Sequence, residues 1–434
     1  MKREMQALMG MLLMSGVTAA ACAGPAATLD QELAAVAADP AMPLASLSVL
    51  AVRNGKVQYR YQTGQRRIGA SAAPVGADTM FRIASISKMM TTFGVMKLVE
   101  QHRLELDADV GAYLGYALRN PHFPERPVTL RMLLTHTSSL RDDGGYSWGA
   151  DVAIRDKLSG GTAGVWASNA APGLYFTYTN LNWGVIGTIM EKVSGERFDR
   201  LMKRLLLEPM GIRGGYNPSE FSAAELADVA TLYRKRTVDT EAWDSDGPWI
   251  AQVDDYGARP PAPPAGIAGY VIGGNGTLFS PTGGMRISAN DLGKIMLMLI
   301  NQGQYQGQQI LKPETVTLMF SQQWRHTGDE GGGNGDTYRG LYHSWGLGSQ
   351  RFDDLPGSGN RLVEGGGFSA AGHLGDAYGL ISTFVVDLER GNGMVSLIGG
   401  TGADPEHNRG RYSAMTRSEE RILTAVYRHA ILGQ

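Results

Sequence analysis

Strand-like segments stand near both ends of the chain, with helical periodicity between them. Near the N-terminus, strand-like runs over 47–53 and 56–63 are joined by an Asn-Gly dipeptide, the commonest signal for a two-residue hairpin. Near the C-terminus, the runs 380–387 and 394–398 flank a Gly- and Asn-rich turn. The simplest assembly places both pairs in one antiparallel sheet, because a single hairpin cannot bury its apolar face.

Helices are expected on the outside of this sheet and through the middle of the chain. Capping boxes predict one helix that starts after Thr28 and another that starts after Thr416. The predicted fold class is α+β: an antiparallel β-sheet of about five strands from both chain ends, flanked by helices, with a mostly helical inserted region. We assign residues 28–80 and 281–434 to the sheet domain and 81–280 to the insertion.

Residues 1–22 have the layout of a secretory signal peptide. Basic residues precede an apolar run and then three alanines before Cys22, the only cysteine. The apolar run is too short to span a bilayer as a mature anchor. The stretch 19–22 resembles a bacterial lipobox, whose cysteine becomes the lipidated first residue, although Ala19 stands where Leu is usual; the alternative is plain cleavage at an Ala-x-Ala site. We expect export to the periplasm or cell envelope, with membrane contact only through a lipid anchor at Cys22.

Composition excludes several other classes. With 40 basic and 42 acidic residues, the chain has no net field to hold nucleic acid, so no nucleic-acid partner is expected. A lone cysteine excludes an internal disulfide framework, and the eight histidines lack ligand spacing. G-x-x-x-x-G-K, H-E-x-x-H and G-x-S-x-G motifs are absent. We therefore expect no metal and no organic cofactor, and the oligomeric state is not determined by the sequence.

One segment, 81–93, carries residues suited to nucleophilic catalysis. Ser85 and Lys88 stand three apart, so on a helix they share a face and the lysine reaches the hydroxyl. A serine needs an adjacent base, and a lysine acts as one when burial lowers its pKa; the apolar neighbours favour such burial. The alternative is that Ser85 is only an N-cap and Lys88 is solvated, because S-x-x-K also arises by chance.

Two further segments contain candidate residues. After a Pro-Gly turn, Tyr178 and Asn180 would lie on one side of an extended segment, and a phenol whose pKa is lowered by an ammonium can pass a proton to a leaving group. In 369–376, Gly372 and Gly375 flank His373, which could hydrogen-bond a substrate carboxylate or a proton-relay group. Taken singly, these residues are better explained as a core tyrosine, an N-cap and a loop histidine.

In combination, these motifs resemble the serine β-lactamase and penicillin-binding-protein-like superfamily in its class C-like branch. That branch includes class C β-lactamases, DD-carboxypeptidases, D-aminopeptidases and related esterases. The resemblance runs from about residue 46 to 400, and the segments 133–140 and 283–292 add to it, with Ser139 in place of the usual Gly. The third motif is H-x-G rather than the K-T-G or K-S-G of class C β-lactamases, which weakens the case for an efficient β-lactamase.

The resemblance implies a role for each matching residue. It makes Ser85 the acylated nucleophile, Lys88 its partner, Tyr178 the general acid/base, Asn180 the substrate-amide binder, and His373 with Gly375 the third motif. It also implies an oxyanion hole of two backbone N–H groups, those of Ser85 and Asp376. Whether Lys88 or Tyr178 is the base stays open at this point.

The sequence therefore predicts an exported serine hydrolase that works through an acyl-enzyme. The expected partner is a small-molecule or peptide substrate: a D-amino-acid peptide, an amide, a lactam or an ester. The alternative is a non-catalytic sensor or envelope protein of the same fold that binds β-lactams or peptides. Substrate choice would depend on the loops 141–170 and 244–276, which the sequence does not place.

Overall fold

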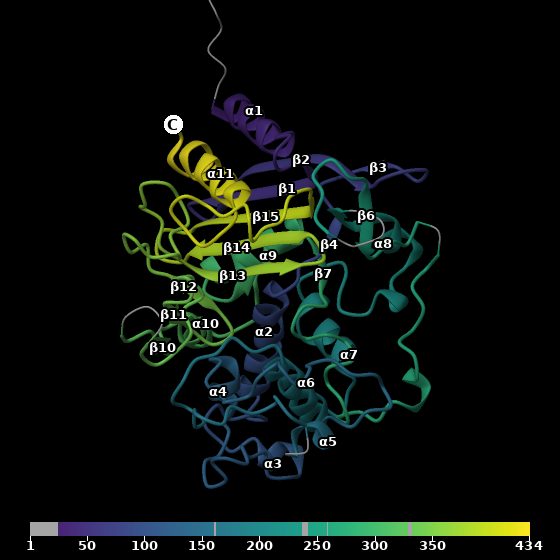
Figure 1. The fold of residues 1–434 in the computed structure, drawn as a ribbon, viewed down its shortest axis with the longest axis vertical. Coiled ribbons are helices and arrows are strands. Elements are labelled where there is room, and N and C mark those ends of the chain that lie inside the picture. Colours follow the sequence, from purple (N-terminus) through teal and green to yellow (C-terminus); the bar gives the residue numbers. More distant parts are fainter. Residues whose placement is uncertain (1–24, 160–161, 237–241, 258, 329–331) are drawn as a thin grey trace, which may run out of the picture.

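The computed structural model describes the chain outside residues 1–24, 160–161, 237–241, 258 and 329–331 (Figure 1). The predicted signal peptide and the lipidation site Cys22 thus lie outside the described residues. Within the described residues, no helix combines the length and the apolar character that crossing a membrane requires.

Five long antiparallel strands form the middle of the main sheet. In spatial order they are β13 (Ala370–Ala377), β14 (Leu380–Asp387), β15 (Asn392–Thr401), β1 (Leu44–Arg53) and β2 (Lys56–Arg67). The two chain ends meet where β1 pairs with β15, with Leu50 opposite Val395. The antiparallel α+β fold predicted from the sequence is therefore confirmed, as are the two hairpins.

Shorter strands extend this sheet to eleven in the described part of the chain. They are β12 (Gln350–Phe352), β11 (Ser344–Trp345) and β10 (Trp324–Arg325) beyond β13, β3 (Ala73–Pro74) beyond β2, and β5 (Leu232–Lys235) with β6 (Trp249–Val253) beside the end of β15. Strands β5 and β6 lie in the region that we expected to be mostly helical. β5 is a strand because the end of β15 offers free backbone groups with which it pairs.

Helices cover both faces of the sheet. Over one face lie α1 (Pro25–Ala37) and α11 (Arg417–Val426), and over the other lies α9 (Ala289–Ile300) (Figure 1). The capping box at Thr416 is confirmed. The start expected after Thr28 is wrong, because 25–28 are already helical where the described part of the chain begins.

The remaining helices mostly form a second layer below the sheet (Figure 1). They are α2 (Ile86–Glu100), α3 (Gly111–Leu114), α4 (Leu130–Leu134), α5 (Ile154–Leu158), α6 (Leu181–Ser194), α7 (Phe198–Met202), α8 (Ala223–Asp228) and α10 (Pro313–Phe320). A small ladder of β4 (Met80–Arg82) with β7 (Arg286–Ser288) connects this layer to the sheet. The chain passes from β4 into α2 through the segment that contains Ser85.

Candidate active site

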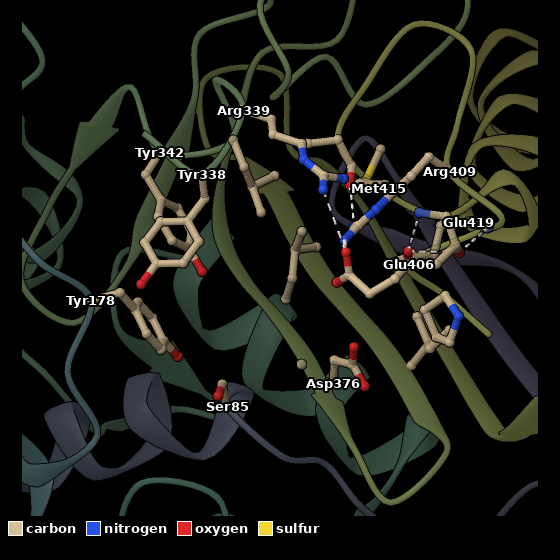
Figure 2. A pocket seen from close by; sticks show the side chains of 17 residues that line it. Ser85, Tyr178, Tyr338, Arg339, Tyr342, Asp376, Glu406, Arg409, Met415 and Glu419 are labelled. Atoms are coloured by element: carbon tan, nitrogen blue, oxygen red, sulfur yellow. Dashed lines mark hydrogen bonds and ion pairs between the residues drawn. The ribbon is translucent and has the colours of Figure 1, made fainter. Parts of the chain in front are cut away.

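Ser85 lies where the chain enters α2. The residue before it, Ala84, has a φ of +45°, a left-handed conformation that costs a non-glycine residue about 1–3 kcal/mol and persists only where the surroundings impose it. Strand β13 passes directly alongside, since a Cβ built on Gly375 would lie 3.1 Å from the backbone nitrogen of Ser85. The strained turn thus presents the hydroxyl and the amide of Ser85 toward a sheet edge and a cavity (Figure 2).

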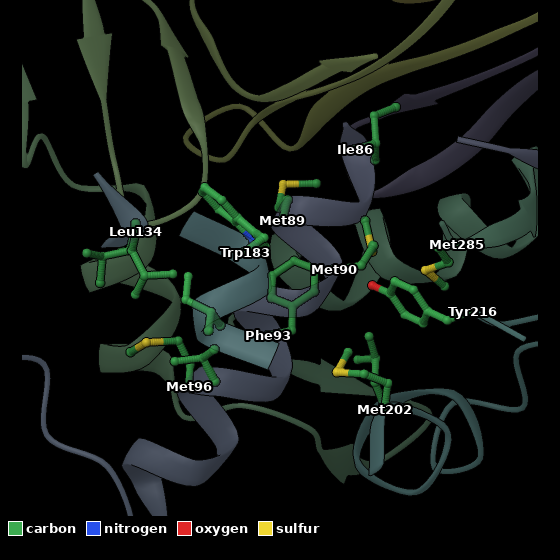
Figure 3. Close-up of a cluster of buried hydrophobic side chains, with 14 of the residues drawn as sticks. Ile86, Met89, Met90, Phe93, Met96, Leu134, Trp183, Met202, Tyr216 and Met285 are labelled. Atoms are coloured by element: carbon green, nitrogen blue, oxygen red, sulfur yellow. The ribbon is translucent and has the colours of Figure 1, made fainter. Parts of the chain in front are cut away.

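The helix that carries Lys88 is buried on nearly every side. Met89, Met90 and Phe93 of α2 pack among side chains from α4, α6 and α7 (Figure 3). Lys88 itself is 0% exposed. This confirms the burial that the apolar neighbours predicted.

Three oxygen atoms surround the amine of Lys88. Its Nζ atom lies 2.9 Å from Oγ of Ser85, 2.8 Å from Oδ1 of Asn180 and 3.1 Å from the carbonyl oxygen of Thr282. The side-chain carbonyl of Asn180 and the backbone carbonyl of Thr282 can only accept hydrogen bonds. A neutral amine therefore gives its two hydrogens to them and turns its lone pair toward the hydroxyl of Ser85.

Burial lowers the pKa of Lys88 to about 7, and the distant negative charge of Asp142 only partly opposes this shift. Among the described residues, no carboxylate forms a salt bridge with the amine. A substantial fraction of the lysine is thus neutral near pH 7, which the role of a general base requires.

Tyr178 points its hydroxyl toward the same serine (Figure 2). Its phenol hydrogen-bonds to Ser85, and its ring lies between His136 and Tyr342, with centroid separations of 4.4 and 5.3 Å. The prediction that a neighbouring ammonium lowers the pKa of this phenol is wrong. Burial among aromatic rings raises the pKa of Tyr178 well above its ordinary value, and the hydrogen bond with Ser85 only partly opposes this shift, so the phenol is neutral.

Asn180 occupies the N-cap position of α6, but Asp142 performs the capping. The carboxylate of Asp142 accepts from the backbone nitrogens of Asn180 and Leu181 at 2.8 and 2.9 Å, and from Nδ2 of Asn180 at 2.9 Å. Oδ1 of Asn180 accepts from Lys88 and from the hydroxyl of Thr282. The expected substrate-amide binder is therefore also the residue that orients the lysine.

His373 lies inside β13 and not in a loop. It is buried, and its Nδ1 atom lies 2.6 Å from the carbonyl oxygen of Leu374. Burial, helped by the charge of Lys88, lowers the pKa of His373 to about 3. The ring is therefore neutral near pH 7, and its expected hydrogen bond to a substrate carboxylate or a proton-relay group stays a prediction.

A cavity of about 390 Å³ opens beside Ser85. Tyr178, Tyr338 and Tyr342 stand along one side of it and Asp376 stands on the other (Figure 2). Strand β12 pairs only with the first residues of β13, as far as Gly372. The edge of β13 at 373–377 is therefore open next to Ser85, as an oxyanion hole from the backbone of Ser85 and Asp376 requires.

Acidic side chains outnumber basic ones on the cavity wall. Arg339 and Arg409 both pair with Glu406. Asp376 has neither a hydrogen bond nor an ion pair from its side chain to the described residues, and burial between the walls raises its pKa. Burial raises the pKa of the neighbouring Glu419 to about 7, and the charge of Asp376 adds to this shift. Asp376 is thus the one wall carboxylate whose side chain has no partner in the described part of the chain.

Sequence reasoning missed several residues of the site. Asp142 and Thr282 orient Asn180 and Lys88, yet both lie in loops without a motif. His136, which supports Tyr178, lies in the segment 133–140 that resembled the superfamily, and this was the available signal. In the same segment Ser139 has a φ of +66°, which explains why glycine is usual there.

The family model described as Beta-lactamase matches residues 34–416, so the chain belongs to the beta-lactamase family. The resemblance found in the motifs is therefore confirmed.

Curated relatives match over shorter stretches. The chain is 30% identical over 179 residues to D-alanyl-D-alanine-carboxypeptidase/endopeptidase AmpH of Escherichia coli (strain K12), covering 39% of this chain and 45% of that protein. It is 28% identical over 169 residues to Protein flp of Staphylococcus aureus (strain N315), covering 38% of this chain and 33% of that protein. The chain thus spans less than half the length of either relative.

Solved structures resemble the whole fold. A class C beta lactamase from Rhodobacter sphaeroides has a TM-score of 0.63 at 17% identity, covering 92% of this chain and 98% of that one. The octameric penicillin-binding protein homologue from Pyrococcus abyssi has a TM-score of 0.63 at 23% identity, covering 94% and 77%. D-amino acid amidase from Ochrobactrum anthropi SV3 has a TM-score of 0.59 at 19% identity, covering 87% and 91%. At these identities, the three structures establish the fold alone.

Proposed function

We propose that this protein is an exported serine hydrolase that transfers acyl groups through Ser85. The observation that carries the proposal is the buried amine of Lys88, 2.9 Å from Oγ of Ser85 with its other two hydrogen bonds given to carbonyl oxygens. A buried lysine without a carboxylate partner is costly to keep in a core. Activation of a serine nucleophile is a function that accounts for this cost.

Acylation uses the neutral form of Lys88. The amine takes the hydroxyl proton of Ser85 while Oγ forms a bond to the carbonyl carbon of the substrate. The carbonyl oxygen becomes an oxyanion held by the backbone N–H groups of Ser85 and Asp376. The intermediate then collapses, the bond to the leaving group breaks, and the leaving group receives a proton from the phenol of Tyr178, which is restored by the ammonium of Lys88.

Deacylation uses the same catalytic groups, with water as the attacking nucleophile. Lys88, neutral again, removes a proton from the water as its oxygen attacks the acyl carbon. The bond to Oγ of Ser85 breaks, and the proton returns to the serine. The products are a free acid and an unmodified enzyme, so the cycle needs no cofactor.

The substrates that suit this site are small acyl donors, namely peptides, amides, lactams or esters. The named activities of the relatives fall in this range: a D-alanyl-D-alanine carboxypeptidase, a class C beta lactamase and a D-amino acid amidase. The unpaired carboxylate of Asp376 in the cavity supports neutral or cationic donors over anionic ones.

An acylation experiment tests the proposal. The full chain is incubated with p-nitrophenyl acetate, with nitrocefin and with a D-alanyl-D-alanine peptide, while product release and intact-protein mass are followed. We expect turnover of one or more of these donors and an acyl adduct on Ser85, both abolished by Ser85→Ala. The exposed Ser71 provides a matched control, since Ser71→Ala should behave as the unaltered protein. Stable adduct without turnover would instead support a non-catalytic sensor, and an adduct elsewhere would refute the assignment of Ser85.

Localisation is a separate part of the proposal and rests on the leader alone. We propose that residues 1–22 direct the chain to the periplasm or cell envelope and that Cys22 is lipidated. Expression in a Gram-negative host with a labelled fatty acid tests this. Label in the protein that is lost in Cys22→Ala supports anchoring, whereas an unlabelled protein cleaved at the leader supports plain export, and a full-length cytoplasmic protein contradicts both.

A further inference from the structure

Two buried histidines lie behind the ring of Tyr178 and take no part in the proton transfers above. His136 and His373 are 1% and 2% exposed. His136 stacks on Tyr178, whereas the ring centroid of His373 lies 6.2 Å from that of Tyr178. Both histidines meet the indole of Trp345 at a steep angle, with centroid distances of 5.0 and 5.5 Å.

Fixed backbone partners determine the tautomer of each ring. The backbone N–H of Thr179 donates to Nδ1 of His136 at 2.9 Å, so Nδ1 has no proton and the neutral ring carries its proton on Nε2. The carbonyl of Leu374 can only accept, so Nδ1 of His373 carries the proton and its Nε2 atom is bare. The two rings therefore expose a donor and an acceptor, respectively.

These complementary atoms have no partner among the described residues. Nε2 of His136, Nε2 of His373 and the indole nitrogen of Trp345 are all buried and without a hydrogen bond to the described part of the protein. Buried polar groups are nearly always paired, and an internal water typically makes about three hydrogen bonds. The donors are Nε2 of His136 and the indole nitrogen, and the acceptor is Nε2 of His373; together they form a set that a single water can satisfy.

We propose that one buried water bridges His136 to His373, and that His136 is a positioning residue for Tyr178. The water accepts hydrogen bonds from His136 and Trp345 and donates to His373. The face of His136 then holds the ring of Tyr178 against Ser85 from a fixed direction. The bridge also favours the neutral form of both histidines, so neither ring adds a positive charge beside Lys88.

Nitrogen NMR of the full chain with labelled histidine tests the bridge. At pH 7 we expect a neutral His136 protonated on Nε2, a neutral His373 protonated on Nδ1, and an Overhauser contact from the His136 proton to a long-lived water. A proton on Nδ1 of His136, or an Nε2 proton without contact to water, would overturn the bridge. This measurement needs no turnover, so an inactive enzyme would count against the proposed function and not against the bridge.

A substitution tests the positioning role, which rests on the proposed function. His136→Asn keeps an acceptor for Thr179, and asparagine tolerates the φ of +58° at this position. We expect roughly a tenfold fall in kcat with KM nearly unchanged, and a lower melting temperature because a buried ring packed on aromatic side chains is lost. His102→Asn is the matched control, because the exposed His102 has a φ of +55° and lies outside the site. Unchanged kcat in a folded His136→Asn protein would overturn the role, as would a rise in KM alone.

Discussion

Oδ1 of Asn180 lies 2.8 Å from Nζ of Lys88, and this contact helps to set the direction in which the amine presents its lone pair. The hydroxyl of Thr282 and the carboxylate of Asp142 hold Asn180 in turn. A connected set of hydrogen bonds therefore fixes the orientation of the base. The pH of the solution should then act on the base through its protonation state.

The first prediction concerns pH. Because burial depresses the pKa of Lys88 to about 7 and the neutral amine is the active form, kcat/KM should rise about tenfold per pH unit below pH 7 and level off above it. Initial rates with an uncharged p-nitrophenyl ester between pH 5 and 9 measure this. A profile that stays flat through pH 7, or activity retained by Lys88→Arg, would contradict the role of the lysine.

The second prediction concerns the space beside Ser85. A Cβ on Gly375 would lie 2.5 Å from Oγ of Ser382 and 2.6 Å from the carbonyl oxygen of Ile83, so Gly375→Ala must displace β13 from Ser85. We expect kcat to fall by at least about a hundredfold, as for loss of an oxyanion donor. Gly269→Ala is the control, since its Cβ would meet nothing within 4 Å. Equal kcat values in the two variants would refute the proposed oxyanion hole.

The third prediction concerns the charge of the substrate. Alanine p-nitroanilide, its N-acetyl form and its N-succinyl form place a positive, a neutral and a negative group on the same acyl donor. We expect kcat/KM to decrease in that order, and Asp376→Asn to reduce the preference for the cation by about tenfold. Glu419→Gln should act in the same direction while it keeps the cap of α11, because glutamine also serves in a capping box. A higher kcat/KM for the anionic donor would show that the charges on the cavity wall do not determine the choice of substrate.

The fourth prediction concerns stability. Arg286 in β7 makes a bidentate pair with Asp254, at 2.6 and 3.0 Å, and their side chains are 8% and 0% exposed. Asp254→Asn should lower the free energy of unfolding by about 3–5 kcal/mol in urea titrations, because it leaves Arg286 buried and uncompensated. At the exposed pair of Arg131 with Asp107, the control Asp107→Asn should cost less than about 1 kcal/mol.

The same pair adds a pH dependence with a definite sign. Arg286 holds the pKa of Asp254 below its ordinary value, so the ion pair contributes stability above the ordinary pKa of aspartate. That contribution is lost as pH falls through the lower, folded-state pKa. The difference in stability between the unaltered protein and Asp254→Asn should therefore shrink on acidification, and a difference that grows would contradict the ion pair.

Local spacing was enough to predict the parts of the site that lie on one element. Ser85 and Lys88 meet because three residues on a helix bring side chains to one face. The capping box at Thr416 and the Asn-Gly hairpin have the same local origin. Tyr178 and Asn180 were identified because their order along the chain matches the motifs of the superfamily. Their approach to Ser85 and Lys88 depends on the tertiary fold.

Other features depend on surroundings that spacing does not encode. The pKa of Tyr178 follows from the rings of His136 and Tyr342, which come from distant segments, so its direction could not be read from nearby residues. Asp142 and Thr282 are ordinary polar residues in loops until the fold brings them to Asn180. Strand β5 likewise depends on the free end of β15, which only the assembled sheet provides.

The pairing of β1 with β15 also bears on how the chain can be made. Leu50 leaves the ribosome long before its partner Val395, so β1 and β2 wait as an incomplete hairpin with an open edge until nearly the whole chain has been synthesised. Contacts this distant in sequence slow folding and prolong the exposure of apolar surface. Truncation before β15 should therefore yield aggregates or a chaperone-bound chain, and not a smaller folded unit.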